Sequence, residues 1–142
     1  MQSQESDQII AFLADQVVKG ADAPQLAAVI GKAYQDIEII LTPIIGKRGA
    51  AALFKRSLHL TALTHPWMLS GHVGGEVDVD IEKLKSVLMQ QTSVEAAAGG
   101  GFLLQTFYEL LATLVGRSLA GRLLRSVWIT FLSGSAAREM SK

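Results

Sequence analysis

The sequence predicts an all-α fold, a compact bundle of about five to six helices joined by short loops. Apolar residues recur at spacings of three and four, which is the period of a helix with one buried face. Ser, Thr and Asp stand where these stretches begin, and Gly or Pro stands where they end. The alternation typical of strands is weak and falls within one irregular Gly-rich segment, about 67–79.

The first two helices are predicted from their end signals. Ser6 can cap a first helix that ends at Gly20. Asp22 and Gln25 have the spacing of a capping box, in which each side chain bonds the other residue's main chain, and they open a second helix. We expect this second helix to kink or end at Thr42-Pro43, because proline lacks the N–H and clashes with the preceding turn.

A third helix is predicted from about Gly49 to Leu63, where His65-Pro66 ends it. Within the irregular segment that follows, residues 73–79 alternate weakly and could form a short strand or hairpin arm. Asp80 then caps a fourth helix.

The C-terminal part predicts two more helices. Thr92 to Glu95 is a second capping box, which opens a fifth helix. The glycines at 99–101 are expected either to break it or to mark a close helix crossing. Gly116 ends it, and Ser118 starts a last helix. The chain is expected to form one domain over residues 1–142, with 1–5 and 134–142 frayed.

Composition suggests self-association. Hydrophobic residues make up 49% of the chain and charged residues 18%, against about 25% in an average domain. One copy of this size would have difficulty burying so much apolar surface, so we predict a homodimer or a larger complex. The formal net charge is +0, so no overall basic field attracts nucleic acid.

Several classes of protein are disfavoured. The chain has no cysteine, which removes disulfides, thiolate metal sites and cysteine nucleophiles. Its polar first residues do not resemble a signal peptide, and it contains no continuous apolar stretch of about 20 residues. We therefore expect a cytoplasmic protein without an integral membrane span.

Two stretches resemble each other, residues 41–61 and residues 111–130. Each reads as helix, glycine, basic residue and second helix, and a one-residue gap aligns Arg56 with Arg125. One interpretation is a duplicated helix pair related by a pseudo-two-fold axis. The other is chance, since any two helix–Gly–helix segments share an apolar period and helices often end at glycine.

The histidines offer no catalytic pattern. His59, His65 and His72 lack the i, i+4 spacing that places two metal ligands on one helical face. His59 follows Lys55 and Arg56 as a phosphotransfer histidine could, but the expected basic residue after it is missing. The triple glycine lacks the preceding strand and following lysine of a phosphate-binding loop. We therefore predict no enzyme activity and no cofactor.

The sequence thus favours a non-enzymatic helical module that binds itself or an unidentified protein, and one candidate role for it is that of an adaptor in bacterial signalling. Candidate interface residues are aromatic or apolar, since tryptophan is common at interface hot spots: Trp67, Met68, Leu69, Trp128 and Phe131. Candidate basic contacts, expected to pair with Asp36, Glu38, Glu109 or an acidic partner, are Lys47, Arg56, Arg117 and Arg125. Alternatives are a sensor of an apolar ligand or haem, and a helix-turn-helix-like nucleic-acid binder.

Overall fold

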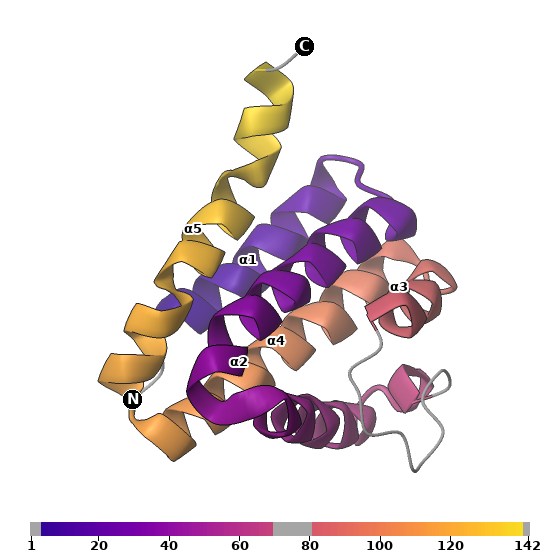
Figure 1. Cartoon of the computed structure of the whole chain (residues 1–142). Coiled ribbons are helices and arrows are strands. Elements are labelled where there is room, and N and C mark those ends of the chain that lie inside the picture. Colours follow the sequence, from indigo (N-terminus) through magenta and orange to yellow (C-terminus); the bar gives the residue numbers. More distant parts are fainter. Residues whose placement is uncertain (1–3, 70–80, 141–142) are drawn as a thin grey trace.

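The computed structural model describes residues 4–69 and 81–140, and it describes side-chain surroundings for residues 9–68, 82–127 and 129. Every regular element in the described ranges is helical, which confirms the predicted all-α fold. The elements are α1 (Gln4–Val18), α2 (Ala23–Ala62), the short 3-10 helix η1 (Pro66–Leu69), α3 (Ile81–Met89), α4 (Ser93–Val115) and α5 (Arg117–Met140) (Figure 1). None of these helices is long and apolar enough to cross a bilayer.

The predicted helix starts at Asp22 and Thr92 are confirmed. The Asp22 carboxylate accepts from the Gln25 N–H at 3.0 Å, and the Gln25 side chain accepts from the Asp22 N–H at 2.9 Å. Thr92 Oγ1 accepts from the Glu95 N–H at 3.1 Å. Only the first pair is a complete capping box, because the Glu95 side chain accepts a hydrogen bond from Trp67 instead. The proposed cap at Asp80 lies outside the described residues.

The interruption of α2 is three residues later than predicted. Pro43 lies inside the helix, and the helical backbone is lost at Gly46, which has φ 82° and ψ 160°. Residues with a side chain rarely adopt this backbone conformation, so glycine sets the position of the turn. Proline removes one hydrogen bond but keeps a helical φ, which explains why it is tolerated in the last turn before the break. Figure 1 shows the sharp change of chain direction there.

Of the two expectations for the glycines at 99–101, the close crossing is confirmed. The glycines do not break α4, which is continuous through them. They allow a close crossing instead: a Cβ on Gly100 would overlap the end of the Ile30 side chain, and one on Gly99 would lie 2.6 Å from the Trp67 ring. At the C-terminus α5 is helical to Met140, and the fraying expected from residue 134 stays a prediction.

The two halves of the chain share one helix plan. Asp22 and Thr92, the N-caps of α2 and α4, lie 70 residues apart, and so do Gly46 and Gly116. The two glycines also share a backbone conformation, since Gly116 has φ 93° and ψ 148°. We call Gly46 and Gly116 the glycine corners. Each is preceded by a long helix and followed by a second one.

Burial repeats with the same offset and without a gap, which favours the duplicated helix pair over chance similarity. Buried pairs related by 70 residues are Leu26/Ala96, Ala27/Ala97, Ile30/Gly100, Gly31/Gly101, Ala33/Leu103, Tyr34/Leu104, Ile37/Phe107, Leu41/Leu111, Ala50/Ala120, Phe54/Leu124 and Ser57/Val127. This register makes Lys55 the equivalent of Arg125. The equivalence of Arg56 with Arg125, expected from the gapped alignment, is therefore wrong by one position.

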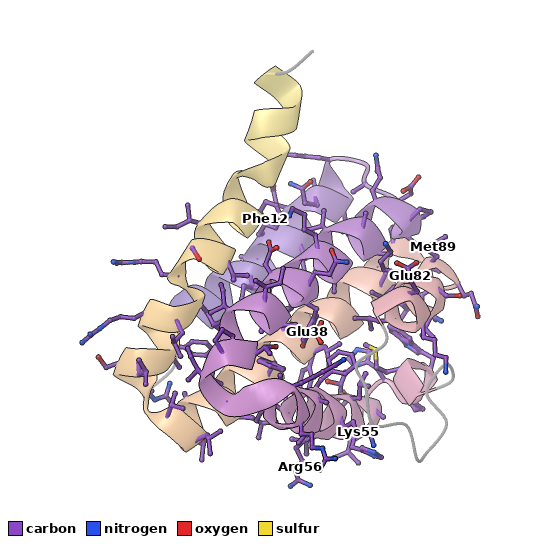
Figure 2. All side chains as sticks on the ribbon, viewed as in Figure 1. Phe12, Glu38, Lys55, Arg56, Glu82 and Met89 are labelled. Carbon is purple, nitrogen blue, oxygen red and sulfur yellow. The ribbon has the colours of Figure 1, made fainter. Side chains whose placement is uncertain are left out.

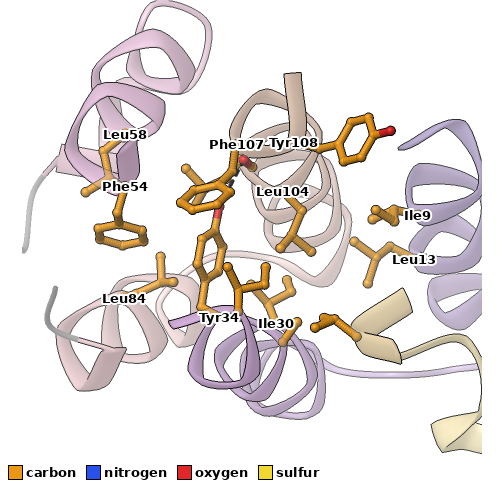
Figure 3. Packing of buried hydrophobic residues seen from close by; sticks show 14 of the residues in the cluster. Ile9, Leu13, Ile30, Tyr34, Phe54, Leu58, Leu84, Leu104, Phe107 and Tyr108 are labelled. Atoms are coloured by element: carbon orange, nitrogen blue, oxygen red, sulfur yellow. Dashed lines mark hydrogen bonds between the residues drawn. The ribbon is translucent and has the colours of Figure 1, made fainter. Parts of the chain in front are cut away.

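The short helix of each half packs on the long helix of the other half, around one shared core. α1 packs mainly on α4 of the other half, and α3 packs mainly on α2 (Figure 1). Tyr34 lies between the two long helices, where its hydroxyl donates to the Leu103 carbonyl at 3.0 Å and its ring contacts Phe54 and Phe107 edge to face (Figure 3). This reciprocal packing is the arrangement expected for two copies related by a pseudo-two-fold axis.

Candidate interaction surfaces

The predicted interface segment at Trp67–Leu69 belongs largely to the core. Met68 is 0% exposed, so its assignment to an exposed interface is wrong. The Trp67 ring is half-buried against Gly99, and its Nε1–H donates to Glu95 Oε1 at 3.2 Å. η1 thereby packs against α4 at Gly99. The surroundings of the Leu69 side chain lie outside the described residues.

The second predicted interface pair, Trp128 and Phe131, lies on the later turns of α5. The described side chains do not include these two, so their role stays a prediction. Figure 1 shows the last turns of α5 extending beyond the other helices.

An exposed apolar strip on α2 was not anticipated. Ile39 is 71% exposed and Ile44 is 50% exposed, while Ile40 is half-buried and Pro43 is exposed. Their spacing places the four on one side of the helix just before the Gly46 corner. We call these four residues the apolar strip.

A groove runs beside the apolar strip. It has a volume of about 220 Å³, and it is lined by Asp36, Ile39 and Ile40 of α2 together with Ser126 and Val127 of α5. The groove is open to solvent at the contact of two helices from different halves. Such a shallow, partly apolar depression suits a protruding side chain of another protein better than an enclosed small molecule.

One apolar pocket among the described residues of the bundle interior is too small for a ligand. The apolar pocket between Tyr34, Phe54 and Phe107 has a volume of about 10 Å³, whereas small-molecule sites commonly span about 300–1,000 Å³. Burial raises the pKa of Tyr34 well above its ordinary value, because the charged form would lose its hydration. This pocket is too small for the apolar ligand or haem of the sensor alternative.

The predicted basic contacts all lie after a glycine corner. Lys47 and Arg117 follow Gly46 and Gly116 directly, and both are exposed. Arg56 and Arg125 are exposed further along their helices. Among these four, Arg117 has an ion-pair partner in the described residues: its Nη2 lies 3.3 Å from Glu109 Oε1. This confirms the predicted pairing with Glu109 for one of the four cations.

Several other cations of these helices also lack an ion pair with a described residue. Asp36, another expected partner, is bonded to Lys32 at 3.5 Å instead. Described cations without an ion pair to a described residue are Lys47, Arg48, Lys55, Arg56, Arg122 and Arg125. All six lie between Gly46 and Ala62 or after Gly116, so uncompensated positive charge is concentrated on the second helix of each half.

The histidines do not form a site within the described ranges. His59 is exposed on the same side of α2 as Lys55 and Arg56, and His65 Nδ1 lies 2.9 Å from Thr64 Oγ1. No three His, Asp or Glu side chains of the described residues come close enough to hold a metal ion. His72, with the acidic residues that follow it, lies outside those ranges.

No protein-family model, curated protein or solved structure matches this chain. The site must therefore be argued from the chain's own geometry. The apolar strip and the unpaired cations are the two features that distinguish its surface.

Neither Ile39 nor Ile40 is among the interface residues predicted from the sequence. A signal was available: an apolar residue directly beside Ile40, followed by Pro43 and Ile44, widens the apolar face beyond what one neighbouring helix can cover. The unpaired state of the six cations had no sequence signal, because ion pairing depends on which helices meet.

Proposed function

We propose that this protein is a non-enzymatic helical interaction module that associates with a second copy of itself through the apolar strip of α2. The observation that supports the proposal is the exposure of Ile39 and Ile44 beside a groove shaped by two helices. Isolated exposed apolar residues are ordinary, but an adjacent set of four next to a depression is typical of an interface.

Self-association fits the geometry of the strip. A two-fold contact between identical copies is self-complementary, so the same patch must supply both the protruding side chains and the depression. Here Ile39 and Ile40 line the groove, and Ile44 protrudes one turn further along the helix. The Lys32–Asp36 ion pair at the far end would place one polar pair at the rim of the contact.

The experiment compares the solution mass of three forms of the protein by sedimentation velocity at micromolar concentrations. We expect the wild type to be a dimer and Ile39→Glu to weaken the dimer by about thirty-fold, which corresponds to roughly 2 kcal/mol for a central interface residue. Val94→Glu is the matched control, because Val94 is 62% exposed at the start of α4, away from the strip.

Circular dichroism must show unchanged helix content for both variants. A wild-type monomer at micromolar concentration contradicts the proposal, and so does a dimer that Ile39→Glu leaves intact. Equal weakening by Ile39→Glu and Val94→Glu would indicate a general effect of added negative charge rather than a specific contact, and it would also reject the strip as the interface.

The nucleic-acid alternative keeps one supporting observation, the unpaired cations on the second helix of each half. Each glycine corner resembles the short helix–turn–helix unit of such proteins. A fluorescence anisotropy titration with a DNA duplex tests it, since phosphate binding would weaken steeply as salt rises.

A further inference from the structure

One face of α2 has positive charge without compensation. After the Gly46 corner, Lys47, Arg48 and Arg56 are exposed and Lys55 is half-buried. We call these four residues the basic face. None has an ion-pair partner among the described residues, and the sequence contains no Asp or Glu between Glu38 and Glu76. Figure 2 shows Lys55 and Arg56 at the edge of the molecule, with Arg56 extending away from the helices.

Most of the carboxylates in the described side-chain ranges are engaged elsewhere. Each of several described acidic side chains already has a partner: Asp15 with Lys19, Asp36 with Lys32, Glu82 with Lys85, Glu109 with Arg117, Asp22 with the Gln25 N–H, and Glu95 with Trp67. The described part of a second copy therefore offers little negative charge to the basic face, which favours a different molecule as its partner.

We infer that the basic face is the docking site for an acidic segment of a partner protein. This inference rests on the proposed function, since it identifies the partner of an interaction module, but it concerns a different surface from the apolar strip. Arg48 precedes Lys55 and Arg56 by seven and eight residues, which is about two helical turns, so the three lie along one side of α2. An acidic helix laid along that side can place carboxylates opposite all three.

The surroundings of the basic face favour a protein over nucleic acid. Leu63, which is 78% exposed, continues the same side of the helix just after its end, beside the exposed His59. An amphipathic helix can use both the cations and this leucine, whereas phosphates would use the cations alone. The formal net charge of +0 also gives the chain no general attraction for polyanions.

The test is a titration of the full-length protein against a fluorescein-labelled peptide made of three repeats of the heptad EELAELL, followed by anisotropy. We expect saturable binding that Arg56→Glu weakens about tenfold, as loss and reversal of exposed ion pairs would produce. Arg48→Glu is a second variant on the same face with the same expected direction. Lys19→Glu is the matched control, since it makes the same charge change on α1 and should alter binding less than twofold.

Three outcomes would overturn the inference. They are the absence of binding at 1 mM peptide, equal weakening by Lys19→Glu, and tighter binding of a 24-base-pair DNA duplex or of phosphatidylserine vesicles than of the peptide. Failure of the proposed dimer can be told apart from failure of this inference. Ile39→Glu should lower the solution mass and leave peptide binding intact, whereas Arg56→Glu should weaken peptide binding and leave the solution mass unchanged.

Discussion

Gly100 is predicted to be a position where even the methyl group of alanine overpacks the core. It is buried in the middle of α4 where that helix crosses α2, and Gly100 and Ile30 are equivalent positions of the two halves. A Cβ added there would overlap Ile30 Cδ1 and lie 3.2 Å from Ile30 Cγ1. Because Ile30 is 0% exposed, its side chain has little room to move away.

Two opposing terms set the magnitude for Gly100→Ala. Alanine in a helix interior is favoured over glycine by about 1 kcal/mol, and overpacking a core costs about 1–3 kcal/mol. Gly121→Ala provides the propensity term without the clash, since its nearest neighbour would be Tyr108 Oη at 3.7 Å. We expect Gly121→Ala to stabilise the protein, and Gly100→Ala to be less stable than Gly121→Ala by about 1–3 kcal/mol.

Urea denaturation followed by circular dichroism measures both free energies of unfolding. Ile30→Val removes the clashing methyl, so it should cost about 1 kcal/mol in the wild type and close to nothing in the Gly100→Ala background. The close crossing would be refuted if Gly100→Ala stabilised the protein as much as Gly121→Ala, or if the two substitutions at 30 and 100 were additive.

Three further predictions concern the helix ends and the core. Gly46→Ala and Gly116→Ala should each lower the free energy of unfolding by about 1–3 kcal/mol although no atom lies within 4 Å of the new Cβ, because φ is positive at both; urea denaturation tests this. Asp22→Ala and Thr92→Ala should each cost about 1 kcal/mol in the same assay, and a loss at only one would contradict equivalent caps. Because burial raises the pKa of Tyr34 above its ordinary value of 10.0, the neutral side chain stabilises the fold below pH 10.0, and this contribution is lost as the pH rises further. The melting temperature should therefore fall more steeply above that pH for the wild type than for Tyr34→Phe.

Features that depend on neighbouring residues in the chain could be predicted well. The capping box at Asp22 and Gln25 is formed by groups three residues apart, so its partners are visible in the sequence. The turn between the two parts of α2 was predicted but assigned to Pro43 instead of Gly46. Proline and glycine are both helix breakers, and only the backbone conformation shows that the positive φ lies at the glycine.

Features that depend on contacts between helices could not be fixed from the sequence. The glycines at 99–101 read equally well as a break or as a close crossing until Ile30 and Trp67 are seen against them. The repeat was detected through the letters Arg-Ser, which occur at 56–57 and at 125–126. Matching those letters introduced a gap, whereas the burial of Phe54 and Leu124 defines the register without one.

The same difference between local features and contacts between helices applies to the candidate surfaces. Lys47, Arg56 and Arg125 were identified as possible contacts from their positions after glycine, and all three are exposed. Met68 was a candidate interface residue because it lies next to Trp67, yet its side chain is in the core. Short apolar segments look alike whether a protein's own helices or another molecule cover them, so burial decides between the two.

Self-association through the apolar strip is best tested by sedimentation equilibrium, which gives the mass of the purified wild-type protein and of Ile39→Glu as a function of concentration. We expect a dimer of the 15.2 kDa chain at micromolar concentration, and a monomer for the variant under the same conditions. A wild-type chain that stays monomeric throughout that range would contradict it.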